Sequence, residues 1–250
     1  MKDSAEEDLL STGTAPGLYL FPLPLSAEAL QHNWMGEQMR RLLSETRLIF
    51  AENERTARRF ISSLKLGVKI AEYRIERLDK DTVASEIREF LSLLQVSGFA
   101  LLMSEAGCPA IADPGAVLVD ACHRASIPVH PLVGPSSILL ALMASGLSGQ
   151  AFAFHGYLPI DRKDCTSRIR QLELESGRGK CTQLFIETPY RNAAIWQCLL
   201  ESLHPETRLC YAIDITGKSE EILQKKVAEW RAGPPVNWSK LPAVFLFLAR

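Results

Sequence analysis

The sequence lacks closely spaced cysteines, a surplus of charge and any long apolar stretch. Its 6 cysteines are scattered, with no pair at C-x-x-C spacing, and even Cys122-His123 with His130 makes a poor metal cluster. We therefore expect reduced, buried thiols and no metal. A formal net charge of -1 argues against non-specific nucleic-acid binding. The apolar runs at 138–144 and 243–249 are far shorter than the ~20 residues that span a bilayer, so we expect a soluble, cytoplasmic protein with no membrane partner.

Common nucleotide-binding and hydrolase motifs are also missing. Phe21-Pro22-Leu23-Pro24 stands after the first expected strand, where a dinucleotide site would carry G-x-G-x-x-G. Gly179-Lys180 resembles the end of a phosphate loop, but Cys181 replaces the magnesium-binding Ser/Thr and Leu174 replaces the first glycine. No G-x-S-x-G hydrolase turn occurs.

What is present is a regular alternation of strand and helix patterns. Strands are expected at 18–21, 47–51, 99–103, 129–132, 151–155, 183–187, 208–214 and 243–249. Helices are expected at 29–46, 54–64, 83–94 (capped by Asp81-Thr82), 162–176, 189–203 and 219–230, with two more beginning at Asp113 and Gly134. This order predicts an α/β protein with helices on both sheet faces. We divide it into a disordered tail (1–15), an N-terminal α/β domain (16–132) and a C-terminal α/β domain (133–250).

The most informative segment is 104–115, a long loop of small residues that follows an expected strand. Ligands bind outside the carboxyl ends of strands in open α/β sheets, and small residues let the backbone approach a ligand closely. The helix start at Ser136-Ser137 offers free N–H groups and two hydroxyls to a carboxylate or phosphate. Each feature alone is also explained as a turn or an N-cap, and Asp113 as a helix cap. Together they predict a ligand site.

Six segments then stand in a distinctive order along the chain: 18–24, 51–56, 103–115, 132–138, 154–159 and 185–191. Together they resemble the tetrapyrrole methylase superfamily of S-adenosylmethionine-dependent methyltransferases. Within it the chain is most similar to the small-subunit ribosomal RNA 2′-O-ribose methyltransferases that modify a cytidine. The resemblance runs from Leu18 to Trp230.

The resemblance implies two α/β domains, an inter-domain cleft for S-adenosylmethionine, a homodimer, and RNA of the small ribosomal subunit as substrate. Matched by motif, the cofactor-binding residues would be Leu25, Glu105, Gly107, Cys108, Ser136, Ser137, Ile138 and Ile186, with Ala212 and Ala243 on later strands.

Methyl transfer to a ribose hydroxyl needs positioning and a base. Glu52 is our candidate catalytic base, with Arg55 orienting it or holding a phosphate; the alternative is an ordinary i, i+3 surface pair. Basic residues on the later helices could contact RNA or form a solvated face: Arg162, Lys163, Arg168, Arg170, Arg178 and Lys180.

The chain departs from the resembling family after the first strand, where T-P-I-G-N-L is replaced by residues 21–26 without a G-N pair. Pro24 also removes a backbone donor. Slow or absent methylation of the family's cytidine is therefore predicted. Two alternatives stay open: methylation of a tetrapyrrole or another small molecule, and a non-catalytic protein that binds S-adenosylmethionine.

Overall fold

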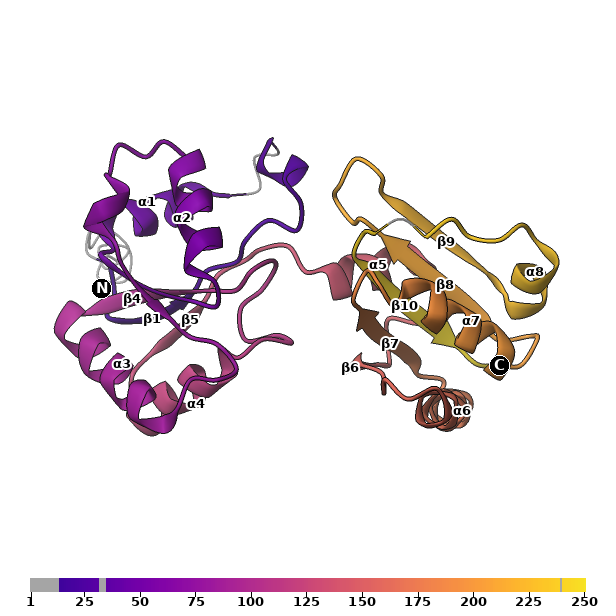
Figure 1. Cartoon of the computed structure of the whole chain (residues 1–250). Coiled ribbons are helices and arrows are strands. Elements are labelled where there is room, and N and C mark those ends of the chain that lie inside the picture. The colour runs from indigo at the N-terminus through magenta and orange to yellow at the C-terminus, as the bar shows by residue number, and fades with distance from the viewer. Residues whose placement is uncertain (1–13, 32–34, 239) are drawn as a thin grey trace, which may run out of the picture. The chain divides into compact units, whose positions relative to one another are not determined.

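The computed structural model describes residues 14–31, 35–238 and 240–250 (Figure 1). Most of the expected tail lies outside these residues. The chain divides into two units. The first runs to Leu23 and continues over Asn33–Gly134, and the second comprises Pro24–His32 and Pro135–Arg250. The break thus follows Gly134, and the segment after the first strand belongs to the second unit.

The first unit is built on a five-stranded parallel sheet in the order β3-β2-β4-β1-β5. Its strands are β1 (Gly17–Leu20), β2 (Leu48–Ala51), β3 (Arg74–Arg77), β4 (Phe99–Met103) and β5 (Val129–Pro131). Its α-helices are α1 (Glu37–Glu45), α2 (Glu54–Ser63), α3 (Ala84–Ser97) and α4 (Ala116–Arg124), with a 3₁₀ turn at Ile70–Glu72.

Helices cover both faces of this sheet, as α/β packing requires. In Figure 1, α1 and α2 lie on one side of the strands and α3 and α4 on the other. Successive strand residues point to opposite faces, so Ile49 packs in the cluster with α1 and α2. Phe50 packs in the cluster with α3 and α4. The three inner strands β2, β4 and β1 are buried on both sides, which explains their nearly continuous apolar sequences.

The second unit carries a mixed sheet in the order β6-β7-β10-β8-β9. Its strands are β6 (Phe152–Tyr157), β7 (Thr182–Glu187), β8 (Arg208–Ile213), β9 (Glu221–Lys226) and β10 (Ala243–Leu248). Only β6 and β7 pair in parallel; the other pairs are antiparallel. Helix α5 (Ser137–Ser145) packs on one face. The other face packs against α6 (Arg162–Gly179), α7 (Asn192–Ser202) and α8 (Val227–Ala232).

The α/β class with two sheets is confirmed, but two expected helices are wrong. The helix expected at 29–46 begins only at Glu37, after Gly36 in an extended N-cap conformation; Glu28–Gln31 is a 3₁₀ turn. The helix expected at 219–230 is mainly strand β9, which pairs with β8 over six residues. Tertiary pairing overrides a pattern that also suited a helix, and only the short α8 follows.

Two expected helix caps also differ from the structure. Helix α3 begins after Val83, whose backbone N–H donates to Glu86 at 2.8 Å, and not after Asp81-Thr82. Helix α4 begins after Gly115 and not after Asp113. The short strand β3 was not expected, because its polar sequence reflects an edge strand that is partly exposed.

Candidate active site

Acidic side chains gather where β2 and β4 end, at one edge of the first sheet. Strands β2 and β4 are parallel neighbours, so the residues that follow them meet although they are about 50 positions apart in the chain. Asn53 donates to the Glu105 carboxylate at 2.8 Å. The backbone N–H of Glu105 points to the carboxylate of Glu52 at 3.4 Å. The fold therefore brings two predicted residues, Glu52 and Glu105, into contact.

Asn53 connects this acidic edge to helix α2. Its side-chain oxygen accepts from the N–H groups of Arg55 and Thr56, at 3.1 and 3.2 Å, and so caps the helix. The same amide holds Glu105 through its nitrogen. Sequence reasoning missed this residue, although an asparagine directly before an amphipathic helix is a common N-cap signal.

Burial raises the pKa of the half-buried Glu52 carboxyl above its ordinary value. The carboxylates of Asp113, Glu105 and Asp79 raise this pKa further, while the N–H of Glu105 lowers it. A carboxylate with a raised pKa is a stronger proton acceptor, as a general base requires.

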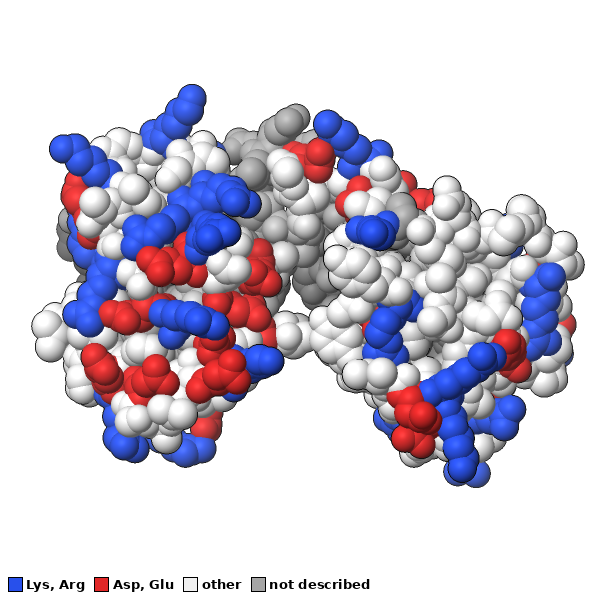
Figure 2. Space-filling model, viewed as in Figure 1, with Lys and Arg blue, Asp and Glu red and all other residues white. Residues whose placement is uncertain are grey.

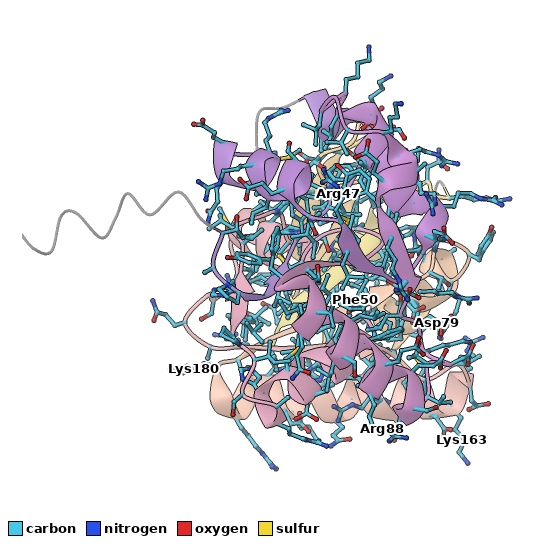
Figure 3. All side chains as sticks on the ribbon, turned by 90° about the vertical axis from the view of Figure 1, so that its left-hand side faces the viewer. Arg47, Phe50, Asp79, Arg88, Lys163 and Lys180 are labelled. Carbon is cyan, nitrogen blue, oxygen red and sulfur yellow. The ribbon has the colours of Figure 1, made fainter. Side chains whose placement is uncertain are left out.

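Glu52 lines an open pocket of ≈ 620 Å³ together with Asn53, Glu54, Arg55, Arg58 and Arg77. Arg58 pairs with Glu54 at 2.6 Å, and Arg77 pairs with Asp79. Figure 3 shows Asp79 nearer the rim of the first unit than Phe50, which is buried. Arg55 makes no ion pair with Glu52 in the part of the chain that the structure describes. The pocket thus combines a proton acceptor with groups that can bind an anion.

The loop at 104–115 is held in place by its own polar groups. Gly107, at a positive φ of 73°, forms a two-bond bridge with Leu23 at 2.9 Å in each direction. Asp113 accepts from the N–H groups of Ala110 and Gly115 at 2.9 and 2.7 Å. Asp113 therefore ties the loop together. Its second oxygen is buried without a hydrogen-bond partner, and burial raises the pKa of this carboxyl.

In the second unit, four predicted cofactor residues pack into one apolar cluster beside α5. Leu25, Ile138, Ile186 and Ala212 share this cluster. Val244 pairs with both Ile186 and Ala212, which places those two in one row across the sheet.

The other predicted cofactor residues lie elsewhere. Ser136 caps α5, accepting from Leu139 at 3.5 Å, and Ser137 is the first residue of the helix. Ala243 packs in the cluster on the opposite sheet face, so its side chain is separated from the α5 cluster. In the first unit, Cys108 follows the Gly107 bridge, and its thiol lies 3.9 Å from the carbonyl of Gly134.

A hydroxyl contact joins Ser26 to Thr216 in the turn after β8, and the sequence does not predict it. Ser26 donates to the carbonyl of Thr216 at 2.9 Å and accepts from the N–H of Ala29 at 3.1 Å. The two partners are 190 residues apart, so no local signal could have found them.

No metal-binding group of three or more side chains and no helix long and apolar enough to cross a membrane occur in the described ranges.

Two curated proteins of the same name are similar to the chain. The ribosomal RNA small subunit methyltransferase I of Micromonospora olivasterospora is 30% identical over 227 residues, covering 91% of this chain and 67% of that protein. Its counterpart in Vibrio cholerae is 29% identical over 218 residues, covering 86% and 70%. The chain thus spans about two thirds of the length of the curated relatives it matches. No protein-family model matches the chain.

Solved structures confirm the two-domain fold. The methyltransferase CobJ has a TM-score of 0.62 at 15% identity, covering 94% of this chain and 100% of that one. Uroporphyrin-III C-methyl transferase from Thermus thermophilus, complexed with S-adenosyl homocysteine, has a TM-score of 0.53 at 16% identity, covering 92% and 96%.

Proposed function

The chain belongs to the ribosomal RNA small subunit methyltransferase I family, within the tetrapyrrole methylase superfamily, and from this premise we propose its reaction. It transfers a methyl group from S-adenosylmethionine to a ribose 2′-hydroxyl of small-subunit ribosomal RNA. It acts in the cytoplasm, where ribosomal subunits are, and works as a homodimer. The observation that carries the choice of a hydroxyl acceptor is Glu52, a half-buried carboxylate with a raised pKa inside an arginine-lined pocket.

The residues proposed to hold the cofactor fit its chemistry on each unit. The α5 cluster offers an apolar surface for the adenine ring through the partly exposed Leu25, Ile138 and Ile186, and the fully buried Ala212 packs in the same cluster. The first N–H groups of α5, at Ser136 and Ser137, suit a carboxylate. On the first unit, the buried Leu23–Gly107 bridge fixes the backbone beside Glu105 and Cys108.

The bound cofactor supplies a methyl group on a positively charged sulfur. The protein must then bring the hydroxyl oxygen in line with that methyl and remove the hydroxyl proton. Glu52 accepts this proton while the oxygen–carbon bond forms and the sulfur–carbon bond breaks. Glu105, Asp113 and Asp79 raise the pKa of Glu52, which strengthens it as a base.

The decisive experiment measures transfer of tritium from labelled cofactor to total RNA from a strain that lacks the gene. We expect small-subunit RNA to be labelled. The phosphodiester bond at one nucleotide should also become resistant to alkaline cleavage, because 2′-O-methylation blocks the hydroxyl that attacks it. Both results should be lost in Glu52→Gln. Labelling of a macrocycle instead would support the small-molecule alternative, and cofactor binding without transfer to any RNA would support the non-catalytic one. Slow turnover is expected, because Pro24 in the loop after β1 has no backbone N–H to donate to the substrate.

A further inference from the structure

Arg55 occupies an unusual position at the start of helix α2. Asn53 is the N-cap, so Arg55 is the second helical residue and lies in the first turn. A positive charge is disfavoured there because the helix dipole is positive at that end. The stability of the helix therefore does not explain an arginine at this position.

The other arginines of the pocket are already engaged. Arg58 donates to Glu54 at 2.7 Å and to the carbonyl of Ile70 at 3.4 Å. Arg77 pairs with Asp79, although its side chain remains 71% exposed. Among the described residues, the Arg55 side chain has no carboxylate partner, and it is not among the groups that lower the pKa of Glu52. Arg55 thus presents an unused guanidinium to the pocket.

Figure 2 shows basic and acidic side chains close together on the face of the first unit that carries α2. An anionic substrate that approaches Glu52 meets repulsion from this carboxylate and its neighbours. A guanidinium at the same pocket offsets the repulsion and can bind two phosphate oxygens at once.

We infer that Arg55, supported by the exposed side of Arg77, binds the phosphodiester group attached to the acceptor ribose. This inference rests on the proposed function and adds the phosphate subsite of its substrate. In RNA the 3′-phosphate is attached to the carbon next to the one that carries the 2′-hydroxyl. A phosphate held by Arg55 therefore limits where that hydroxyl can lie relative to Glu52. The site then selects a nucleotide within a chain over a free nucleoside.

The kinetic test compares Arg55→Gln and Arg55→Lys with a matched control, Arg59→Gln. Arg59 is exposed on the same helix and does not line the pocket. With small ribosomal subunits from the gene-lacking strain, we expect Arg55→Gln to raise KM about tenfold to a hundredfold while kcat stays within about threefold. In Arg55→Gln, the slope of log(kcat/KM) against log salt concentration should become shallower by about 0.7, which corresponds to the loss of one phosphate contact. Arg55→Lys should recover the slope but not the full affinity, and Arg59→Gln should match the wild type.

A binding test makes the subsite independent of turnover. Calorimetry with cytidine 3′-monophosphate and with cytidine should give heat only for the phosphorylated probe, and Arg55→Gln should abolish it. If no RNA is methylated but this loss is seen, the subsite stands and the proposed function falls. If RNA is methylated and Arg55→Gln changes neither KM nor nucleotide binding, the subsite is refuted and the function stands. Equal binding of the two probes, or Arg55-dependent binding of uroporphyrin instead of the nucleotide, also refutes it.

Discussion

Replacing Arg191 with methionine should destabilise the second unit through the buried charge of Glu187. The Glu187 side chain is 0% exposed, and its Oε1 lies 3.3 Å from Arg191 Nη1 without hydrogen-bond geometry. Arg191 also donates to the carbonyls of Leu158 and Pro159, at 3.4 and 2.9 Å. It thereby joins the end of β7 to the segment that follows β6.

The expected loss is about 3 kcal/mol of unfolding free energy at about pH 7.5. Breaking a buried ion pair by removing one partner costs ~3–5 kcal/mol, because an uncompensated charge is left. The value should fall at the lower end, since Arg191 is partly exposed and Glu187 keeps the N–H of Thr188 at 3.3 Å. A Glu187→Gln/Arg191→Met double variant should lose only about 1–2 kcal/mol, because no charge remains buried.

The pH dependence follows from the direction of the Glu187 pKa. Burial raises the pKa of this carboxyl in the folded protein, and Arg191 lowers it, so the variant has a still higher folded pKa. Between the unfolded and the folded pKa, the folded state binds more protons, and stability falls as pH rises. The defect of Arg191→Met should therefore be largest near neutral pH and shrink toward about pH 5.

Urea unfolding followed by tryptophan fluorescence measures this directly, because Trp196, Trp230 and Trp238 all pack in the α6–α7 core of the second unit. Arg170→Met, at an exposed site on α6, is the control and should stay within about 0.5 kcal/mol of wild type. A loss below about 1 kcal/mol in Arg191→Met would refute the reasoning. A loss of the same size at about pH 7.5 and at about pH 5 would also refute it.

Other predictions concern the site and the assembly. Glu52→Gln should lower the methylation rate ~10²–10⁴-fold and leave cofactor affinity unchanged. The wild-type rate should rise with pH, with a midpoint above the pKa of an ordinary glutamate, because burial raises the pKa of Glu52. Bulky residues at both Ser136 and Ser137 should strongly weaken the micromolar S-adenosylmethionine binding expected in calorimetry. The absence of heat from the wild-type protein at high cofactor concentration would contradict the cofactor assignment. Asp113→Ala removes two backbone contacts, should cost about 1–3 kcal/mol, and should speed hydrogen exchange in the loop at 104–115; unchanged exchange would contradict this. Sedimentation should show a dimer, and a monomer at tens of micromolar protein would contradict this prediction. Met143→Asp places a charge on the exposed face of α5, and dissociation of the dimer in this variant would show that the face forms the interface.

Elements with a strong apolar pattern could be predicted from the sequence. Strand β4 and helix α2 are predicted almost at their observed bounds. Strand β4 is a continuous apolar run, and α2 has an amphipathic helical pattern that begins directly after Asn53. The prediction failed at β9, because the sequence of this edge strand carries no clear strand pattern. Its strand conformation comes from pairing with β8. It also failed at Glu28–Gln31, which is a 3₁₀ turn, and at Gly36, which precedes the first residue of α1.

The sequence by itself determined the family, the alternation of strands and helices, and the loops that end at the sheet edge, because motifs and periodicity are local properties. Only the tertiary structure decided which side chains meet. Glu52 and Asn53 contact Glu105 because β2 and β4 are neighbours in the sheet although β3 lies between them in sequence. Asp113 ties its loop and not a helix because the amides of Ala110 and Gly115 turn toward it. Strand order and loop closure depend on packing across the whole unit, so no sequence window contains them.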